Sequence, residues 1–82
     1  MKLPRDISGA ELARLLYRYG YRIVRQTGSP MRLTSAATGA EHHITIPAHS
    51  PLKVGTLSAV LRELAEHLDL DREILAKELF GR

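Results

Sequence analysis

The sequence predicts a single α+β domain in which helices cover one face of a three-stranded antiparallel sheet. Two observations predict it: an apolar helical repeat toward each end of the chain, and three short strand-like stretches joined by tight turns between them. At 82 residues the chain is one domain, 1–82, with a small core. A three-stranded meander cannot bury itself in water, so the helices must supply the second layer.

The first element is a helix that begins after Ser8. Ser8 stands three residues before Glu11, the spacing of a capping box in which each side chain bonds the backbone N–H of the other residue. Gly20 ends the helix as a left-handed cap. The apolar stripe between them, at helical spacing, consists of Leu12, Leu15, Leu16 and Tyr19.

Three strands are expected at 21–26, 31–35 and 42–47, separated by the turns Gly28-Ser29-Pro30 and Thr38-Gly39. Such short turns imply antiparallel pairing. Regular alternation puts Arg22 and Arg25 on opposite faces of the first strand. It also groups the residues of each later strand by face, Met31 with Leu33, Arg32 with Thr34, and Ile44 with Ile46.

Two helices complete the chain. The apolar stripe of the first consists of Leu57, Val60, Leu61, Leu64 and Leu68. His67 stands beside this stripe and is interpreted as a surface residue. Asp71 caps a last short helix whose buried side is expected to hold Ile74, Leu75 and Leu79. The α-β-β-β-α order is that of the double-stranded-RNA-binding fold, here with an extra C-terminal helix.

Composition narrows the class of protein. Hydrophobic residues make up 44% of the chain and charged residues 26%, as in ordinary globular domains. The absence of cysteine excludes a disulfide scaffold, a thiolate zinc site and a thiol nucleophile. No apolar run is long enough to span a membrane, and the first residues lack the apolar segment of a signal peptide. We therefore expect a cytoplasmic protein without membrane contact.

Charge is distributed unevenly along the chain. Residues 1–41 hold seven Lys or Arg and three acidic residues, a net charge of +4. Residues 42–82 hold five Lys or Arg and six acidic residues, a net charge of −1. Nine of the basic residues are Arg, whose planar fork suits phosphate. A solvated surface explains the charge most simply, and a polyanionic partner is the functional alternative.

Several residues are candidates for chemistry. His42 and His43 are adjacent on a strand and point to opposite faces, so a shared metal ion is not expected. His49 lies in the loop 47–51, where a histidine bonded to backbone is the simplest interpretation. Lys53, Gly55 and Thr56 begin a helix and either bind an anion there or form a plain N-terminus capped by Thr56 or Ser50. Arg25 and Arg32 flank the Gly28-Ser29 turn, as phosphate contacts or as part of a solvated face.

Four segments together resemble the HicA toxin family, also called YcfA-like. The resemblance covers about residues 7–70, and residues 71–82 extend beyond it as a C-terminal helix. The segments are Ser8-Gly9-Ala10-Glu11-Leu12, then Tyr19-Gly20-Tyr21 followed by residues 24–29, then His43-Ile44-Thr45-Ile46-Pro47-Ala48-His49, and finally Lys53-Val54-Gly55-Thr56-Leu57.

The resemblance implies a small toxin that cleaves mRNA without a metal ion or other cofactor. A base in such an enzyme helps the RNA 2′-hydroxyl attack the adjacent phosphate, and cations stabilise the developing charge. The family partner is a HicB antitoxin, usually encoded beside the toxin, which buries its active site and often carries a DNA-binding domain. On this chain the resemblance and the residue pattern together assign RNA binding to Arg25, Ser29, Arg32, Lys53, Gly55 and Thr56.

The chain departs from the family at the catalytic position. The family motif is Gly-Ser-His, but this chain has Gly28-Ser29-Pro30, and proline has no side-chain proton to exchange. Three interpretations remain open. Catalysis is reduced or has moved to His43 or His49; the chain is an inactive module that binds RNA or antitoxin; or Pro30 is a selected or engineered change that disarms a toxic protein.

Overall fold

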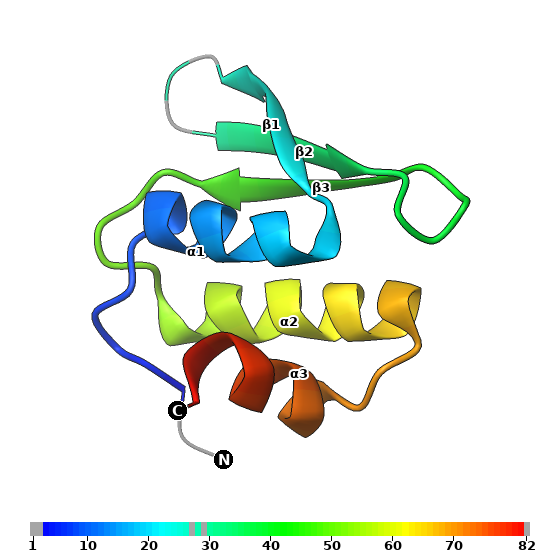
Figure 1. The fold of residues 1–82 in the computed structure, drawn as a ribbon. Coiled ribbons are helices and arrows are strands. Elements are labelled where there is room, and N and C mark those ends of the chain that lie inside the picture. Colours follow the sequence, from blue (N-terminus) through cyan, green and yellow to red (C-terminus); the bar gives the residue numbers. More distant parts are fainter. Residues whose placement is uncertain (1–2, 27, 29, 82) are drawn as a thin grey trace.

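The computed structural model describes residues 3–26, 28 and 30–81, which form a sheet layer and a helix layer (Figure 1). The elements in chain order are α1 (Gly9–Leu15), the 3-10 helix η1 (Leu16–Tyr19), β1 (Arg22–Gln26), β2 (Pro30–Ser35), β3 (His42–Pro47), α2 (Val54–Leu68) and α3 (Arg72–Phe80). This confirms the predicted α-β-β-β-α order with an additional C-terminal helix.

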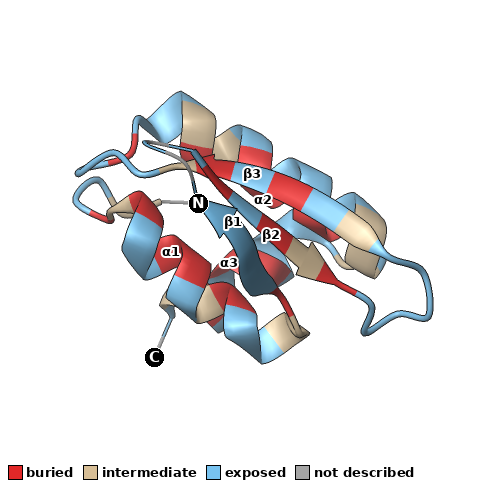
Figure 2. Cartoon of the chain, turned by 90° about the horizontal axis from the view of Figure 1, so that it is seen from above, coloured by how far each residue is buried: buried red, intermediate tan, exposed pale blue. Residues whose placement is uncertain are grey.

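The three strands form one antiparallel sheet in the order β1-β2-β3. Both α1 and α2 lie on one side of it, and the other side is open (Figure 1). Figure 2 shows buried and exposed residues alternating along β2 and β3. The side chains that meet the helices are buried, as predicted, and are Met31, Leu33, Ile44 and Ile46.

The N-terminal helix begins and ends at the residues that the sequence predicts. The Ser8 hydroxyl accepts a hydrogen bond from the Glu11 N–H at 3.0 Å, and the Ser8 N–H donates to the Glu11 carboxylate at 3.0 Å. The bond from the Ser8 N–H to the carboxylate is the main cause that lowers the pKa of Glu11. The last turn tightens into η1 and ends at Gly20, whose φ of 85° lies in the left-handed region.

A bulge in β1 overturns one expectation about the arginines. Arg22 pairs with Thr34 and Arg25 pairs with Arg32, so one extra residue stands between the two pairs. Directly paired residues share a face of the sheet, and both partners belong to the solvent face of β2. Arg22 and Arg25 therefore stand on the same open face, which regular alternation could not predict.

The C-terminal helices confirm the predicted elements but correct two details. Asp71 caps α3, as predicted, by accepting the Glu73 N–H at 2.8 Å. The N-cap of α2 is Lys53 and makes no side-chain cap bond, so capping by Thr56 or Ser50 was wrong. The exposed fraction of Ile74 is 53%, because residue 74 lies opposite the centre of the buried stripe of α3. That stripe is Leu75, Ala76 and Leu79.

Candidate functional site

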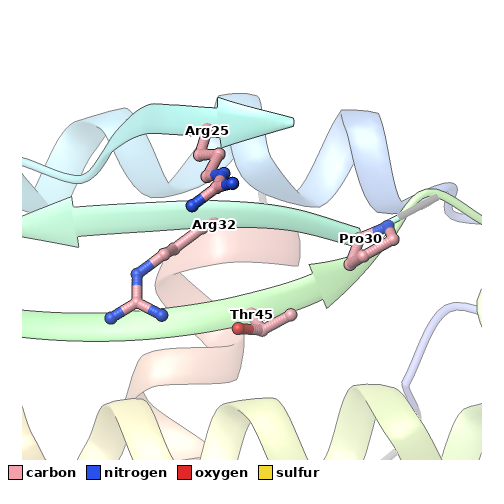
Figure 3. A pocket seen from close by; sticks show the side chains of 4 residues that line it. All are labelled: Arg25, Pro30, Arg32 and Thr45. Atoms are coloured by element: carbon pink, nitrogen blue, oxygen red, sulfur yellow. The ribbon is translucent and has the colours of Figure 1, made fainter. Parts of the chain in front are cut away.

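An open hollow of about 270 Å³ lies on the solvent face of the sheet. Each strand contributes to it: Arg25 from β1, Pro30 and Arg32 from β2, and Thr45 from β3. Figure 3 shows the Arg25 side chain extending from β1 toward β2 and the Arg32 side chain extending from β2 over β3. Two of the predicted RNA-binding residues, Arg25 and Arg32, thus meet in one place.

The two arginines of the hollow are a directly opposed cross-strand pair. Like charges in that arrangement repel and destabilise a sheet. Within the described part of the chain, no acidic side chain forms an ion pair with either guanidinium. An anion bound between them would offset this repulsion, and a guanidinium fork matches the oxygens of a phosphate. The hollow is therefore suited to a phosphate group.

Pro30 forms one edge of the hollow, where β2 begins opposite Pro47 of β3. Its ring is exposed but carries no group that exchanges a proton. The family that the sequence resembles has its catalytic histidine at this position. In this chain the position lies beside the two arginines and supplies only an apolar wall. The neighbouring Ser29 lies outside the described residues.

His43 shares the solvent face with the hollow. It pairs with Thr34, and the adjacent pair on this face is Arg32 with Thr45, about 7 Å along the strands. Its Nδ1 lies 2.7 Å from the Thr34 hydroxyl oxygen, and its Nε2 lies 3.0 Å from a carboxylate oxygen of Glu41. The sequence predicted that His43 and His42 point to opposite faces but did not predict these partners.

His49 lies beyond the end of β3, in the loop that leads to α2. Its carbonyl oxygen accepts a hydrogen bond from the Gly9 N–H at 2.9 Å, and its side chain is exposed. The loop placement agrees with the simplest interpretation of the sequence, and the hydrogen bond runs through the main chain of His49 rather than its imidazole.

Lys53, Gly55 and Thr56 occupy the start of α2, as predicted. Figure 1 shows that α1 and α2 begin at the end of the molecule where β2 begins and β3 ends. The described residues that line the hollow include none of these three. They belong to the helix layer, and the structure does not bring them together with Arg25 and Arg32.

A second cluster of polar rings lies at the opposite end of the sheet. The His42 ring stacks on the His67 ring with centroids 4.1 Å apart, and its Nδ1 lies 2.7 Å from the Tyr21 hydroxyl. Burial, and then the charge of His67, lower the pKa of His42. His67, interpreted from the sequence as a surface residue, is half-buried and also lies 3.0 Å from the Thr38 hydroxyl, so it has partners that the sequence did not predict.

Tyr21 in the same cluster is fully buried, and its hydroxyl has a hydrogen-bond partner in His42. Burial, with the nearby Glu63 carboxylate, raises the pKa of Tyr21 to about 12. Glu63 in turn approaches His42 Nε2 at 3.4 Å. The hydroxyl of Tyr21 therefore stays protonated and joins the residue that precedes β1 to the start of β3 as a structural contact. In residues 3–26, 28 and 30–81, no group of three or more metal-binding side chains could hold an ion.

The structure defines a small α+β domain that has the element order of the double-stranded-RNA-binding fold and arginines on the open face of its sheet. Comparison with protein families matches residues 9–65 to the HicA toxin of bacterial toxin-antitoxin systems. The match covers more than half of the chain, which therefore belongs to the HicA toxin family. Comparisons with curated proteins and with solved structures gave no match.

Family membership identifies the chain as a toxin of a toxin-antitoxin system. The matched segment runs from the start of α1 into α2 and includes all four residues of the hollow. It ends before α3, which adds to the family core. No helix of the described residues has the length and apolar character needed to cross a membrane.

Proposed function

We propose that this toxin binds messenger RNA on the solvent face of its sheet and acts there as an mRNA interferase. The observation that carries the proposal is the opposed pair of Arg25 and Arg32, which line one hollow with the Thr45 hydroxyl. The arginines supply charge-assisted hydrogen bonds and the hydroxyl a neutral one. These groups suit a phosphodiester, the repeating unit of RNA.

The basic face continues beyond the hollow to Arg22. The bulge puts residue Arg22 on the same face, and its side chain reaches the edge of the sheet beside η1. There the guanidinium donates to the Tyr21 carbonyl at 2.8 Å and lies 4.6 Å from the centre of the Tyr17 ring. Tyr17 is 42% exposed, and an exposed ring beside an arginine is a surface on which an RNA base can stack. We propose that the RNA strand runs from the hollow toward this pair.

The alternative is an inactive module that binds RNA or antitoxin. Pro30 favours it, because the loss of a general acid or base typically lowers a rate by about 10²–10⁴-fold. Both alternatives use the same binding face, so binding and cleavage must be measured separately.

We further propose that a HicB-type antitoxin covers this face with acidic groups opposite Arg25 and Arg32. Complementary charge would direct its approach, and coverage of the hollow would exclude RNA. Titration of the antitoxin into the RNA complex should release the RNA. A ternary complex that keeps both the RNA and the antitoxin would contradict a shared site.

Binding to RNA is tested by fluorescence anisotropy with a short single-stranded RNA at several salt concentrations. Arg25→Ala and Arg32→Ala should each weaken binding roughly tenfold and lower the salt slope by about one. Arg62→Ala is the matched control, since Arg62 is an exposed arginine on α2 in the helix layer. Equal affinities of all three variants and the unmodified chain would contradict the proposal.

A Lys53→Ala variant tests whether the strand also reaches the start of α2. Lys53 is exposed and is the N-cap residue of that helix, whose free N–H groups favour an anion. If RNA extends to this end, the variant lowers the salt slope by about one. An unchanged slope restricts the RNA site to the sheet.

A further inference from the structure

We propose that His43 is the catalytic base of this toxin and that Glu41 orients it, replacing the histidine absent at Pro30. The inference rests on the proposed RNA site and adds to it the residue that moves a proton. The Glu41 carboxylate, the His43 imidazole and the Thr34 hydroxyl form one hydrogen-bonded chain on the open face of the sheet.

The two contacts of His43 assign a role to each ring nitrogen. A carboxylate accepts hydrogen bonds, so Nε2 carries the proton and donates it to Glu41 at 3.0 Å. Nδ1 then holds the lone pair and accepts the Thr34 hydroxyl proton at 2.7 Å. Enzymes activate hydroxyl groups with this arrangement, in which a carboxylate fixes the tautomer and the direction of an imidazole beside the hydroxyl.

The position of His43 suits the phosphate site. The pair Thr34–His43 adjoins the pair Arg32–Thr45 on the same face, about 7 Å away along the strands. The ribose that precedes a phosphate held by Arg32 would therefore lie over Thr34 and His43. Its 2′-hydroxyl would take the place of the Thr34 hydroxyl as hydrogen-bond donor to Nδ1.

His49 is the weaker candidate for this role. It lies two residues beyond the end of β3, and the hydrogen bond assigned to it among the described residues runs through its carbonyl oxygen to Gly9. His43, in contrast, lies within a strand and both of its ring nitrogens have partners. An oriented base is the more effective one, because proton transfer requires hydrogen-bond geometry.

The reaction follows from these positions. Nδ1 of His43 takes the proton of the 2′-hydroxyl while the 2′-oxygen attacks the adjacent phosphorus. The bond from phosphorus to the 5′-oxygen breaks, and that oxygen takes a proton from water. The products are a 2′,3′-cyclic phosphate and a 5′-hydroxyl, and His43 returns its proton to the solvent. Arg32 stabilises the negative charge that develops on the phosphate oxygens.

The test is cleavage of end-labelled RNA in the presence of EDTA, with the full chain and its variants. The unmodified chain should produce cyclic phosphate ends. His43→Gln should lower the cleavage rate by about 10²-fold or more while the RNA affinity stays within twofold (roughly 0.4 kcal/mol). His49→Gln is the matched control and should cleave like the unmodified chain.

Glu41→Gln tests the positioning role. It should lower the rate less than His43→Gln does. Glu41→Asp, which keeps a carboxylate, should retain more of the rate than Glu41→Gln, while the RNA affinity of both variants stays unchanged. A cleavage rate of Glu41→Gln equal to that of the unmodified chain would reject the role of Glu41. Circular dichroism of each variant verifies that the fold is intact.

The outcomes separate the two proposals. RNA binding without cleavage by the unmodified chain would overturn the catalytic role of His43 and leave the binding proposal standing. Cleavage that survives His43→Gln but is lost in His49→Gln would also overturn it. Failure to bind RNA at all would overturn the proposed function itself.

Discussion

Gly9 packs directly against the main chain of Pro47, so closely that a Cβ at residue 9 would overlap the Pro47 carbonyl oxygen. The Gly9 N–H also donates a hydrogen bond to the His49 carbonyl at 2.9 Å. These contacts join the first turn of α1 to the end of β3. Because β3 contributes Thr45 to the hollow and pairs with Pro30, the helix layer helps to fix the site.

Gly9→Ala should therefore destabilise the protein. Steric overlap with a buried main chain typically costs about 1–3 kcal/mol, and urea unfolding measures the loss. Gly55→Ala is the matched control, because a Cβ at Gly55, in the first turn of α2, meets no atom of the described structure within 4 Å. Removing that glycine should raise the free energy of unfolding by about 0.5 kcal/mol. Equal stability of the two variants would contradict the close approach.

The packing of α3 predicts a contrast between two neighbouring residues. Leu75 is fully buried, whereas Ile74 is 53% exposed. Leu75→Ala should lower the free energy of unfolding by about 2–5 kcal/mol, and Ile74→Ala should change it by less than about 0.5 kcal/mol. Similar losses for both variants would indicate that α3 packs through a different face.

The contacts of Glu78 support this role for α3 within the fold. Its carboxylate accepts a hydrogen bond from the Tyr19 hydroxyl, and its carbonyl oxygen accepts one from Arg18. Burial, followed by Glu78, raises the pKa of Tyr19 to about 12. The helix beyond the family match is thus joined to η1 and completes the helix layer.

The His42 cluster predicts a pH dependence of stability. Burial lowers the pKa of His42 below its ordinary value of 6.5, so near that pH the unfolded chain binds a proton more readily than the folded chain. Stability is therefore fully present above pH 6.5 and declines as the pH falls toward the lowered pKa. Thermal unfolding at a series of pH values should show this decline, and His42→Gln should reduce it. A profile that His42→Gln leaves unchanged would assign the decline to another group.

Pro30→His should increase RNA cleavage. It adds an imidazole to the hollow beside Arg25 and Arg32, and a positioned general base is worth roughly 10²-fold or more. Pro30→Ala is the control, since it also removes the ring but supplies no base. The rates of both variants are compared with end-labelled RNA at saturating protein. Equal increases in both would trace the effect to loss of the ring and contradict the role of the imidazole.

Local patterns were sufficient to predict the fold. The Ser8 cap, the left-handed Gly20 and the alternation along β2 and β3 each depend on residues close together in the chain. The elements they define are all present in the structure. Two helix details were wrong: the N-cap of α2 is Lys53, and the buried stripe of α3 passes through Ala76 rather than Ile74.

The candidate site depends on contacts that local patterns do not encode. The bulge that aligns Arg22 with Arg25 arises from the register between β1 and β2. The stacking of His42 on His67 joins β3 to α2, and the hydrogen bond between Thr34 and His43 joins β2 to β3. The sequence supplied the residue types for the site, whereas strand register decided which of them meet.

RNA is proposed to occupy the open face of the sheet. NMR chemical-shift mapping of the ¹⁵N-labelled chain with a short single-stranded RNA tests this placement residue by residue. The largest shifts should fall on the amides of Arg25, Arg32 and Thr45, with those of α3 unchanged. Shifts confined to α2 and α3, with the sheet unaffected, would contradict it.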